Sequence, residues 1–144
     1  MSPANPRPRP VLLIVDDDPD VLQALTFMAD TRGFEVEHCR TAREAIAAVR
    51  PGRLFACMII DQMLSDDRGI DLLGTLRGRG AKAPAILITS APSEVLKRRA
   101  AAEGAPIVEK PLLDEMLFTQ IDRLTRRLTS PGRPSQRPAD ERPR

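Results

Sequence analysis

Acidic, hydroxyl and ammonium side chains follow four separate apolar runs of this chain. The runs cover residues 11–15, 55–60, 85–88 and 105–108. Asp16 and Asp17 follow the first run, Asp61 the second and Thr89 the third, and Lys110 lies just beyond the fourth. If the runs are parallel strands, their carboxyl ends meet at one edge of a sheet, where open α/β sheets bind ligands. We therefore expect three carboxylates, a hydroxyl and an ammonium group to converge there.

Three carboxylates in a partly dry crevice repel one another unless a cation lies among them. Aspartate oxygens are hard ligands that suit Mg²⁺, and Mn²⁺ could take its place. Once such an ion is bound, it can neutralise one side of a phosphoryl group, while Lys110 and Thr89 neutralise the other. One carboxylate is then left as an in-line nucleophile on phosphorus. Asp61 is the best candidate because it ends the central apolar run.

The same four segments resemble the motifs of a known family. They are the acidic stretch Val15–Asp20, the loop Asp61–Ser65 with Gly69 after it, the segment Leu87–Ser90, and Glu109-Lys110-Pro111. In order and spacing they resemble the receiver domain of response regulators in two-component signalling, over roughly residues 10 to 129. The resemblance implies a doubly wound (βα)5 flavodoxin-like fold, with a five-stranded parallel sheet of order 2-1-3-4-5.

The resemblance also implies a metal site. Asp17 corresponds to a direct Mg²⁺ ligand and Asp16 to one that acts through water. Asp61 and the backbone carbonyl of Met63 complete the protein ligands. No other cofactor is implied.

For the phosphoryl group, the resemblance implies that Asp61 is the phosphoacceptor and that Thr89 and Lys110 contact the phosphoryl oxygens. Two departures from the family pattern stand out. Ser65 replaces the usual proline after the phosphoacceptor, which predicts a less stiff loop. Ile107 stands where many members carry a Tyr or Phe that moves inward upon activation, so that coupling cannot operate here.

The expected function is that of a stand-alone receiver, because no output domain follows in this sequence. Its phosphoryl donor would be a sensor histidine kinase or a histidine phosphotransfer protein, and water would later remove the group from Asp61. The chain would be an enzyme only in this self-modifying sense. The signal would leave through a downstream protein target, through a homodimer, or along a phosphorelay.

Two alternatives remain open. A phosphohydrolase of the haloacid dehalogenase type also uses a strand-end Asp, a Ser or Thr, and a Lys, and residues 16–18 contain an Asp-x-Asp motif. That reading puts Asp20 where Thr or Val is usual, lacks a late acidic pair after Lys110, and leaves Asp61 without a role. The second alternative is a receiver-like scaffold that is never phosphorylated.

Composition predicts one domain with two distinct ends. The 144 residues suffice for one core, and residues 1–10 and 130–144 are rich in proline and arginine, which predicts disordered tails around a domain at 11–129. The net charge of +2 comes from these tails, since residues 11–129 hold 16 basic and 18 acidic side chains. We therefore expect no nucleic-acid partner. The absence of a long apolar stretch argues against a membrane span, and two unpaired cysteines suit the cytoplasm.

Periodicity and capping residues predict a helix after each strand. The expected helices run over residues 19–33, 41–49, 70–76, 93–104 and 112–128, with a second strand at 34–38. On the last helix, Phe118 falls about 100° from the stripe through Leu117 and Ile121. Phe118 is then either packed at the rim of the core or, with Ile107, part of an interface formed by the fourth helix, fifth strand and fifth helix.

Overall fold

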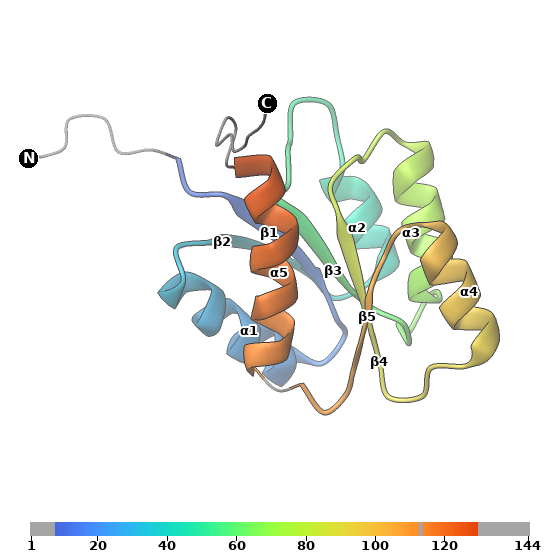
Figure 1. Ribbon diagram of the computed structural model, residues 1–144. Helices are drawn as coiled ribbons and strands as arrows, with labels where there is room; N and C mark the ends of the chain where they lie inside the picture. The colour runs from blue at the N-terminus through green and yellow to red at the C-terminus, as the bar shows by residue number, and fades with distance from the viewer. Residues whose placement is uncertain (1–7, 113, 130–144) are drawn as a thin grey trace, which may run out of the picture.

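The computed structural model describes residues 8–112 and 114–129, in which strands and helices alternate (Figure 1). The strands are β1 (Val11–Val15), β2 (Glu35–Cys39), β3 (Cys57–Asp61), β4 (Ala85–Thr89) and β5 (Ile107–Glu109). The helices are α1 (Pro19–Thr31), α2 (Ala42–Ala48), α3 (Gly69–Gly78), α4 (Glu94–Ala102) and α5 (Asp114–Thr129).

The sheet is parallel throughout and has the order β2-β1-β3-β4-β5, which confirms the predicted fold. Helices α1 and α5 cover one face, and α2, α3 and α4 cover the other (Figure 1). The chain moves outward from β1 to β2 and then returns to β3 on the other side of β1. In such sheets the crevice outside the carboxyl ends of the two central strands is the usual ligand site.

The central strands are apolar on both faces because helices cover both. In β3, Met58 and Ile60 pack toward α2, α3 and α4, whereas Cys57 and Ile59 pack toward α1 and α5. All five residues of β3 are buried, including Asp61 at its end. A carboxylate in this position needs a functional explanation, since buried acids are rare without a partner.

Side chains at the predicted capping positions begin three of the helices. Asp18 accepts a hydrogen bond from Asp20 N at 2.9 Å, and Pro19 occupies the first turn of α1. Thr41 begins α2 and Ser93 begins α4 in the same way. Such caps satisfy backbone donors that have no partner inside the helix. They also place the short loops that lead from the strand ends into the helices.

Two strands begin later than their apolar runs. The run at 55–60 starts two residues before β3, and the run at 105–108 starts two residues before β5. Gly104 turns the chain with a φ of 68° at the end of α4, and Pro106 has no N–H to donate to a neighbouring strand. At the other end, Asp61 and Thr89 belong to their strands instead of following them.

The structure decides between the two readings of Phe118. Only 1% of the residue is exposed, which excludes an exposed interface role and supports packing in the core. Thr125, at about 80° from Leu117, is also buried, so the buried stripe of α5 is centred nearer Phe118 than the leucine spacing predicted. Phe118 belongs to the apolar cluster that contains Leu22 and Leu25 of α1, and the guanidinium of Arg32, just after α1, lies 4.6 Å from the centre of its ring.

The expected tails lie mostly outside the described residues, at 1–7 and 130–144. Arg9, predicted to be disordered, instead contacts the domain. It forms an ion pair of 3.0 Å with Asp30 and donates a hydrogen bond to Phe34 O at 2.7 Å. Pro10 O accepts a hydrogen bond from Glu35 N. The contacts of the domain therefore begin before residue 11.

Candidate functional site

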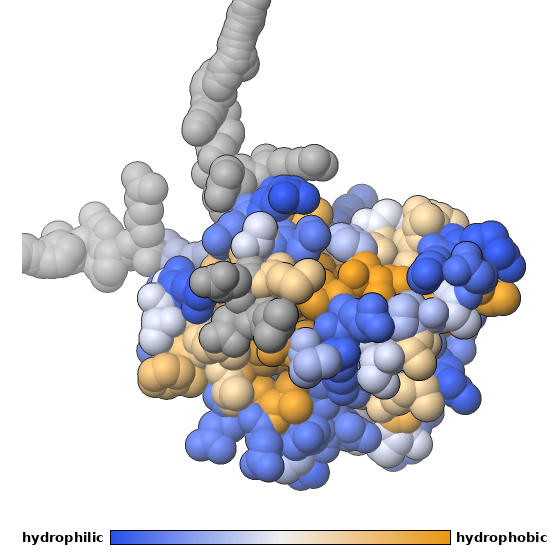
Figure 2. All heavy atoms as spheres, turned by 60° about the horizontal axis from the view of Figure 1, so that its bottom comes forward, coloured by the Kyte–Doolittle hydropathy of each residue, from blue (hydrophilic) through white to orange (hydrophobic). Residues whose placement is uncertain are grey.

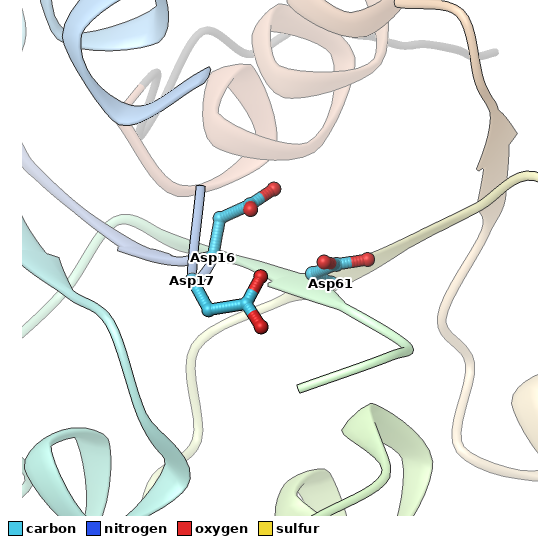
Figure 3. A group of neighbouring side chains, drawn as sticks. All are labelled: Asp16, Asp17 and Asp61. Atoms are coloured by element: carbon cyan, nitrogen blue, oxygen red, sulfur yellow. The ribbon is translucent and has the colours of Figure 1, made fainter. Parts of the chain in front are cut away.

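The predicted convergence of carboxylates is present at the carboxyl edge of the sheet. Asp16 and Asp17 follow β1, and Asp61 ends the neighbouring β3 (Figure 3). One carboxylate oxygen from each residue lies within 4.8 Å of the others. The parallel register accounts for this. Val15 is paired with Ile60, so Asp16 and Asp61, the residues that follow them, lie at the same level.

Asp16 is the least satisfied of the three acids. It is 1% exposed; Oδ1 accepts a hydrogen bond from Asp18 N at 2.9 Å, and Oδ2 is buried without a hydrogen-bond partner among the described residues. Burial, opposed by the Asp18 hydrogen bond and reinforced by the charge of Asp61, raises the pKa of Asp16 to about 6. An unpartnered buried oxygen beside two further carboxylates is the environment that a divalent cation would satisfy.

Asp61 is held between opposing influences. Burial raises the pKa of its carboxyl, while the nearby Lys110 ammonium and the Met63 N–H lower it. Lys110 Nζ lies 3.4 Å from Asp61 Oδ1, and Met63 N donates to the same oxygen at 3.4 Å. Lys110 thus lies at the same edge as the carboxylates, as predicted, and it pairs directly with Asp61. Oδ1 is oriented by two donors, and the described residues give Oδ2 no such contact.

Thr89 ends β4 beside Asp61 and is 4% exposed. Its Oγ1 accepts a hydrogen bond from Ala91 N at 3.3 Å, so the hydroxyl is linked to the loop that leads into α4. Lys110 N donates to Thr89 O at 2.9 Å, which ties the ends of β4 and β5 together. Thr89, Asp61 and Lys110 therefore leave adjacent strands at one edge, as the sequence predicted.

Gln62 and Gly69 shape the loop after Asp61, and their roles were not predicted. Gln62 Oε1 accepts a hydrogen bond from Ile70 N at 2.9 Å, and Gln62 O accepts one from Gly69 N at 2.8 Å. A Cβ added to Gly69 would lie 2.5 Å from Asp61 O, so no side chain fits at this position. The motif spacing pointed to Gly69, but only the structure shows that it allows close approach to the phosphoacceptor candidate.

Asp66 attaches this loop to α2. Its two carboxylate oxygens accept hydrogen bonds from Ala42 N at 2.8 Å and Arg43 N at 3.1 Å, in the first turn of the helix. These bonds, Ala42 first, lower the pKa of Asp66. The loop that lacks a proline at Ser65 is therefore held by a charged cap on a distant helix. No spacing rule would reveal the contact, because the partners are more than twenty residues apart.

We predict that Asp66→Ala lowers the free energy of unfolding at neutral pH by about 1 kcal/mol, the typical loss when a helix cap is removed. Because the folded protein depresses this pKa, the stabilisation is present at neutral pH and is lost as the pH falls through the folded-state value. Urea unfolding at several pH values measures both effects. Asp67→Ala is the matched control, since the hydrogen bond of the Asp67 side chain in the described structure is to Arg68 N of its own loop. Equal losses of unfolding free energy in the two variants would contradict the stabilising role of the Asp66 cap on α2.

The remaining predicted residues lie near the same edge. Met63 is in the loop after Asp61 with a 55% exposed side chain, and its backbone pairs with Arg68. Ile107 begins β5, is partly buried and packs against the core beneath α4. Cys39 and Cys57 are buried thiols whose pKa values burial raises to about 12. They are therefore neutral at physiological pH and play no part in the site.

The model of the response regulator receiver domain matches residues 12–122. This chain belongs to the response regulator receiver family. The match decides against the phosphohydrolase of the haloacid dehalogenase type as an account of the strand-end acids.

Relatives and solved structures agree with this assignment. The chain is 34% identical to the acid tolerance regulatory protein ActR of Rhizobium meliloti over 125 residues, which are 85% of this chain and 64% of ActR. A CheY-like receiver domain protein from Methanospirillum hungatei is 25% identical with a TM-score of 0.79, covering 87% of this chain and all of that one. Chemotaxis protein CheY4 of Vibrio cholerae is 26% identical with a TM-score of 0.74, covering 81% of this chain and 99% of that one.

The chain spans about half the length of the curated relatives that it matches, such as 54% of the transcriptional regulatory protein BasR of Escherichia coli. The similarity therefore concerns the receiver part of those regulators. In the part of this chain that the structure describes, none of the helices has the length and apolar character needed to cross a lipid bilayer.

Proposed function

We propose that this receiver is a phosphorylation switch that accepts a phosphoryl group on Asp61. The observation that carries the proposal is the position of the Asp61 carboxylate, which lies between two other acids and an ammonium group. On one side lie Asp16 and Asp17, with an unpartnered buried oxygen, and on the other side lies the Lys110 ammonium at 3.4 Å. A nucleophilic carboxylate between an acidic pair and a cation suits phosphoryl transfer better than structural support.

Asp16, Asp17 and Asp61 would hold the metal, with Mg²⁺ as the ion that their hard oxygens prefer and Mn²⁺ as a substitute. The backbone carbonyl of Met63 is the fourth candidate ligand. The ion would neutralise negative charge that develops on a transferred phosphoryl group. The unpartnered Asp16 Oδ2 and the pKa of Asp16, which burial raises, fit this role, because a cation would bind that oxygen and stabilise the charged carboxylate.

The protein groups then divide the work of the transfer. Asp61 Oδ2 attacks phosphorus while the bond from phosphorus to a histidine nitrogen of the donor breaks, and that nitrogen keeps the electron pair. Lys110 turns from the Asp61 carboxylate to the new phosphoryl oxygens, and Thr89 Oγ1 donates to one of them. The donor would be a sensor histidine kinase or a histidine phosphotransfer protein.

Thr89 would also transmit the switch. In the unphosphorylated structure its hydroxyl accepts a hydrogen bond from Ala91 N, so recruiting that hydroxyl to a phosphoryl oxygen would shift the β4–α4 loop. Ile107 carries no ring that could move between buried and exposed positions. The change would therefore be carried by the segment between Thr89 and α4 and by the helix itself.

Exposed apolar side chains support a protein partner near this edge. Met63 is 55%, Val95 56% and Met116 58% exposed, and each lies in a loop or first helical turn that follows a strand at the site. Figure 2, with the lower side of Figure 1 turned toward the viewer, shows apolar residues among hydrophilic ones there. Methionine is adaptable at protein interfaces. A phosphodonor, a downstream protein or a second copy would dock on this surface.

The test is phosphorylation by acetyl phosphate with Mg²⁺, followed by borohydride reduction and mass mapping of the modified aspartate. We expect one label, on Asp61. Absence of label under conditions that modify a receiver of known activity would support the alternative of an unphosphorylated scaffold.

We further predict that Asp17→Ala lowers the rate of this labelling at least tenfold and abolishes Mg²⁺ binding, measured by calorimetry. Lys110→Ala should leave Mg²⁺ binding intact or strengthen it, because an ammonium group repels the ion, while labelling still falls. The two variants thus separate metal binding from contact with the phosphoryl group. Equal Mg²⁺ affinity in wild type and Asp17→Ala would contradict the ligand role of Asp17.

A further inference from the structure

A cavity lies at the opposite end of the sheet from Asp61. It has a volume of about 490 Å³ and is formed by the loop before β3, the loop before β4, and Met58 of β3. Its lining consists of residues 49–55, 58 and 79–83. In Figure 1 both loops are at the upper end of the molecule, whereas the loops that carry the acidic site are at the lower end. The cavity is therefore separate from the proposed phosphorylation site.

The charged side chains that line this cavity are all positive. Its lining contains Arg50, Arg53, Arg79 and Lys82, and it contains no carboxylate. Of these four, Arg53 alone forms an ion pair within the described part of the chain, with Glu37 at 2.8 Å. Arg50 donates a hydrogen bond to the neutral Ala48 O. Among the described residues, the side chains of Arg79 and Lys82 have no ion pair or hydrogen bond. Arg50, Arg79 and Lys82 are exposed along the lining of one cavity, so their like charges give it a positive potential that attracts anions.

The walls of the cavity are held in place without a ligand. Arg77 Nη1 donates hydrogen bonds to Ala81 O and Ala83 O, which fixes the loop before β4. On the other side, the Arg53 guanidinium bonds Glu37 on β2 and lies 5.3 Å from the centre of the Phe55 ring. The site is therefore preformed, and binding of a ligand would need little free energy to order the loops.

Apolar surface accompanies the charge. Leu54 is 83% exposed, more than any other large apolar residue in the described part of the chain. Phe55 is half-buried against Arg53, and Met58 closes the floor. A lining that holds both an exposed leucine and uncompensated arginines suits a ligand that has an apolar or planar body and an anionic end.

We propose that this cavity binds a small organic phosphate of the size and charge of a nucleoside diphosphate. The volume falls within the range of about 300–1,000 Å³ that is typical of small-molecule sites. The three uncompensated cations match the roughly three negative charges of a diphosphate group at neutral pH, and guanidinium groups bind phosphate oxygens in a bidentate manner. A cavity of this size between two loops favours a small ligand over an extended polyanion.

Calorimetric titration with ADP in the presence of EDTA tests the proposal. EDTA removes divalent ions, so the result is independent of the acidic site and of phosphorylation. We expect binding by the wild type, and at least tenfold weaker binding by the double variant Arg79→Ala/Lys82→Ala. The control Arg98→Ala/Arg123→Ala also removes two exposed cations, from α4 and α5, and should bind ADP as the wild type does. Failure of the wild type to bind, or equal loss in both double variants, would overturn the proposal.

Further probes identify what the site recognises. Adenosine alone and inorganic pyrophosphate alone should each bind more weakly than ADP, because each fills only one part of the cavity. Upon addition of ADP, the changes in amide chemical shift measured by NMR should be largest in residues 49–55 and 79–83 and small around Asp61. Binding of duplex DNA but not of ADP, at about 0.15 M ionic strength, would show a nucleic-acid surface in place of a nucleotide site.

Discussion

Asp61→Asn is expected to reduce labelling by acetyl phosphate to background while leaving the fold intact. The amide is nearly isosteric with the carboxylate, but it is a poor nucleophile and cannot form a stable acyl phosphate. In the folded protein the Asp61 carboxyl is buried beside two further acids, and burial raises its pKa. A neutral amide at this position removes repulsion, so the free energy of unfolding without metal should rise in the variant.

Radiolabel incorporation and urea unfolding measure the two effects separately. Asp67→Asn is the control, because it makes the same chemical change six residues further along the loop and should retain full labelling. Undiminished labelling of Asp61→Asn would move the phosphoacceptor to another residue. Loss of labelling together with loss of the folded state would leave the assignment without support from this variant, and intact far-UV circular dichroism is therefore part of the expected result.

Asp16→Asn is expected to stabilise the protein at neutral pH when no divalent ion is present. The folded protein raises the pKa of Asp16 from 3.8 to about 6. Between these values the folded state binds more protons than the unfolded state, so the stability of the wild type falls as the pH rises through this interval. A shift of this size corresponds to about 3 kcal/mol at pH 7. Asparagine cannot ionise, and its Oδ1 can still accept from Asp18 N.

The test compares the free energy of unfolding of wild type and Asp16→Asn from pH 4 to pH 7 in EDTA. The difference between the proteins should be small near pH 4 and should grow to its full value above pH 6. Mg²⁺ should then narrow the difference at pH 7, since it stabilises the wild type by binding only the folded state. Asp20→Asn, which changes an exposed acid of the same segment, should show a small loss instead, about 0.5 kcal/mol, from the helix dipole. If the difference in free energy of unfolding between wild type and Asp16→Asn did not change with pH, the proposed link between Asp16 ionisation and stability would be refuted.

Much of the site could be predicted because its residues are attached to the ends of strands. An apolar run of strand length places the residue that follows it at the carboxyl edge, and parallel neighbours bring such residues to the same level. This rule predicts that Asp16, Asp17 and Asp61 meet at one edge, and the structure confirms that their oxygens lie within 4.8 Å of one another. It also placed Lys110 beside Asp61.

The roles of Phe118, Asp66 and Gly69 required the tertiary structure. Helical periodicity gives the spacing of a buried stripe, but the rotation of α5 depends on its packing, in which Phe118 joins a cluster with Leu22 and Leu25 of α1. Asp66 contacts a helix that precedes it by more than twenty residues, and Gly69 is required because the backbone of Asp61 passes close to it.

The sequence by itself determined the alternation of strands and helices, the family resemblance and the acids, hydroxyl and lysine of the site, because these depend on local periodicity and on the ends of elements. The tertiary structure decided how α5 is rotated, how the loop after Asp61 is anchored, and which cations gather in the cavity at the other end of the sheet. Those features depend on contacts between segments far apart in the chain. Such contacts are set by the packing of the whole domain, and no pattern within one segment encodes them.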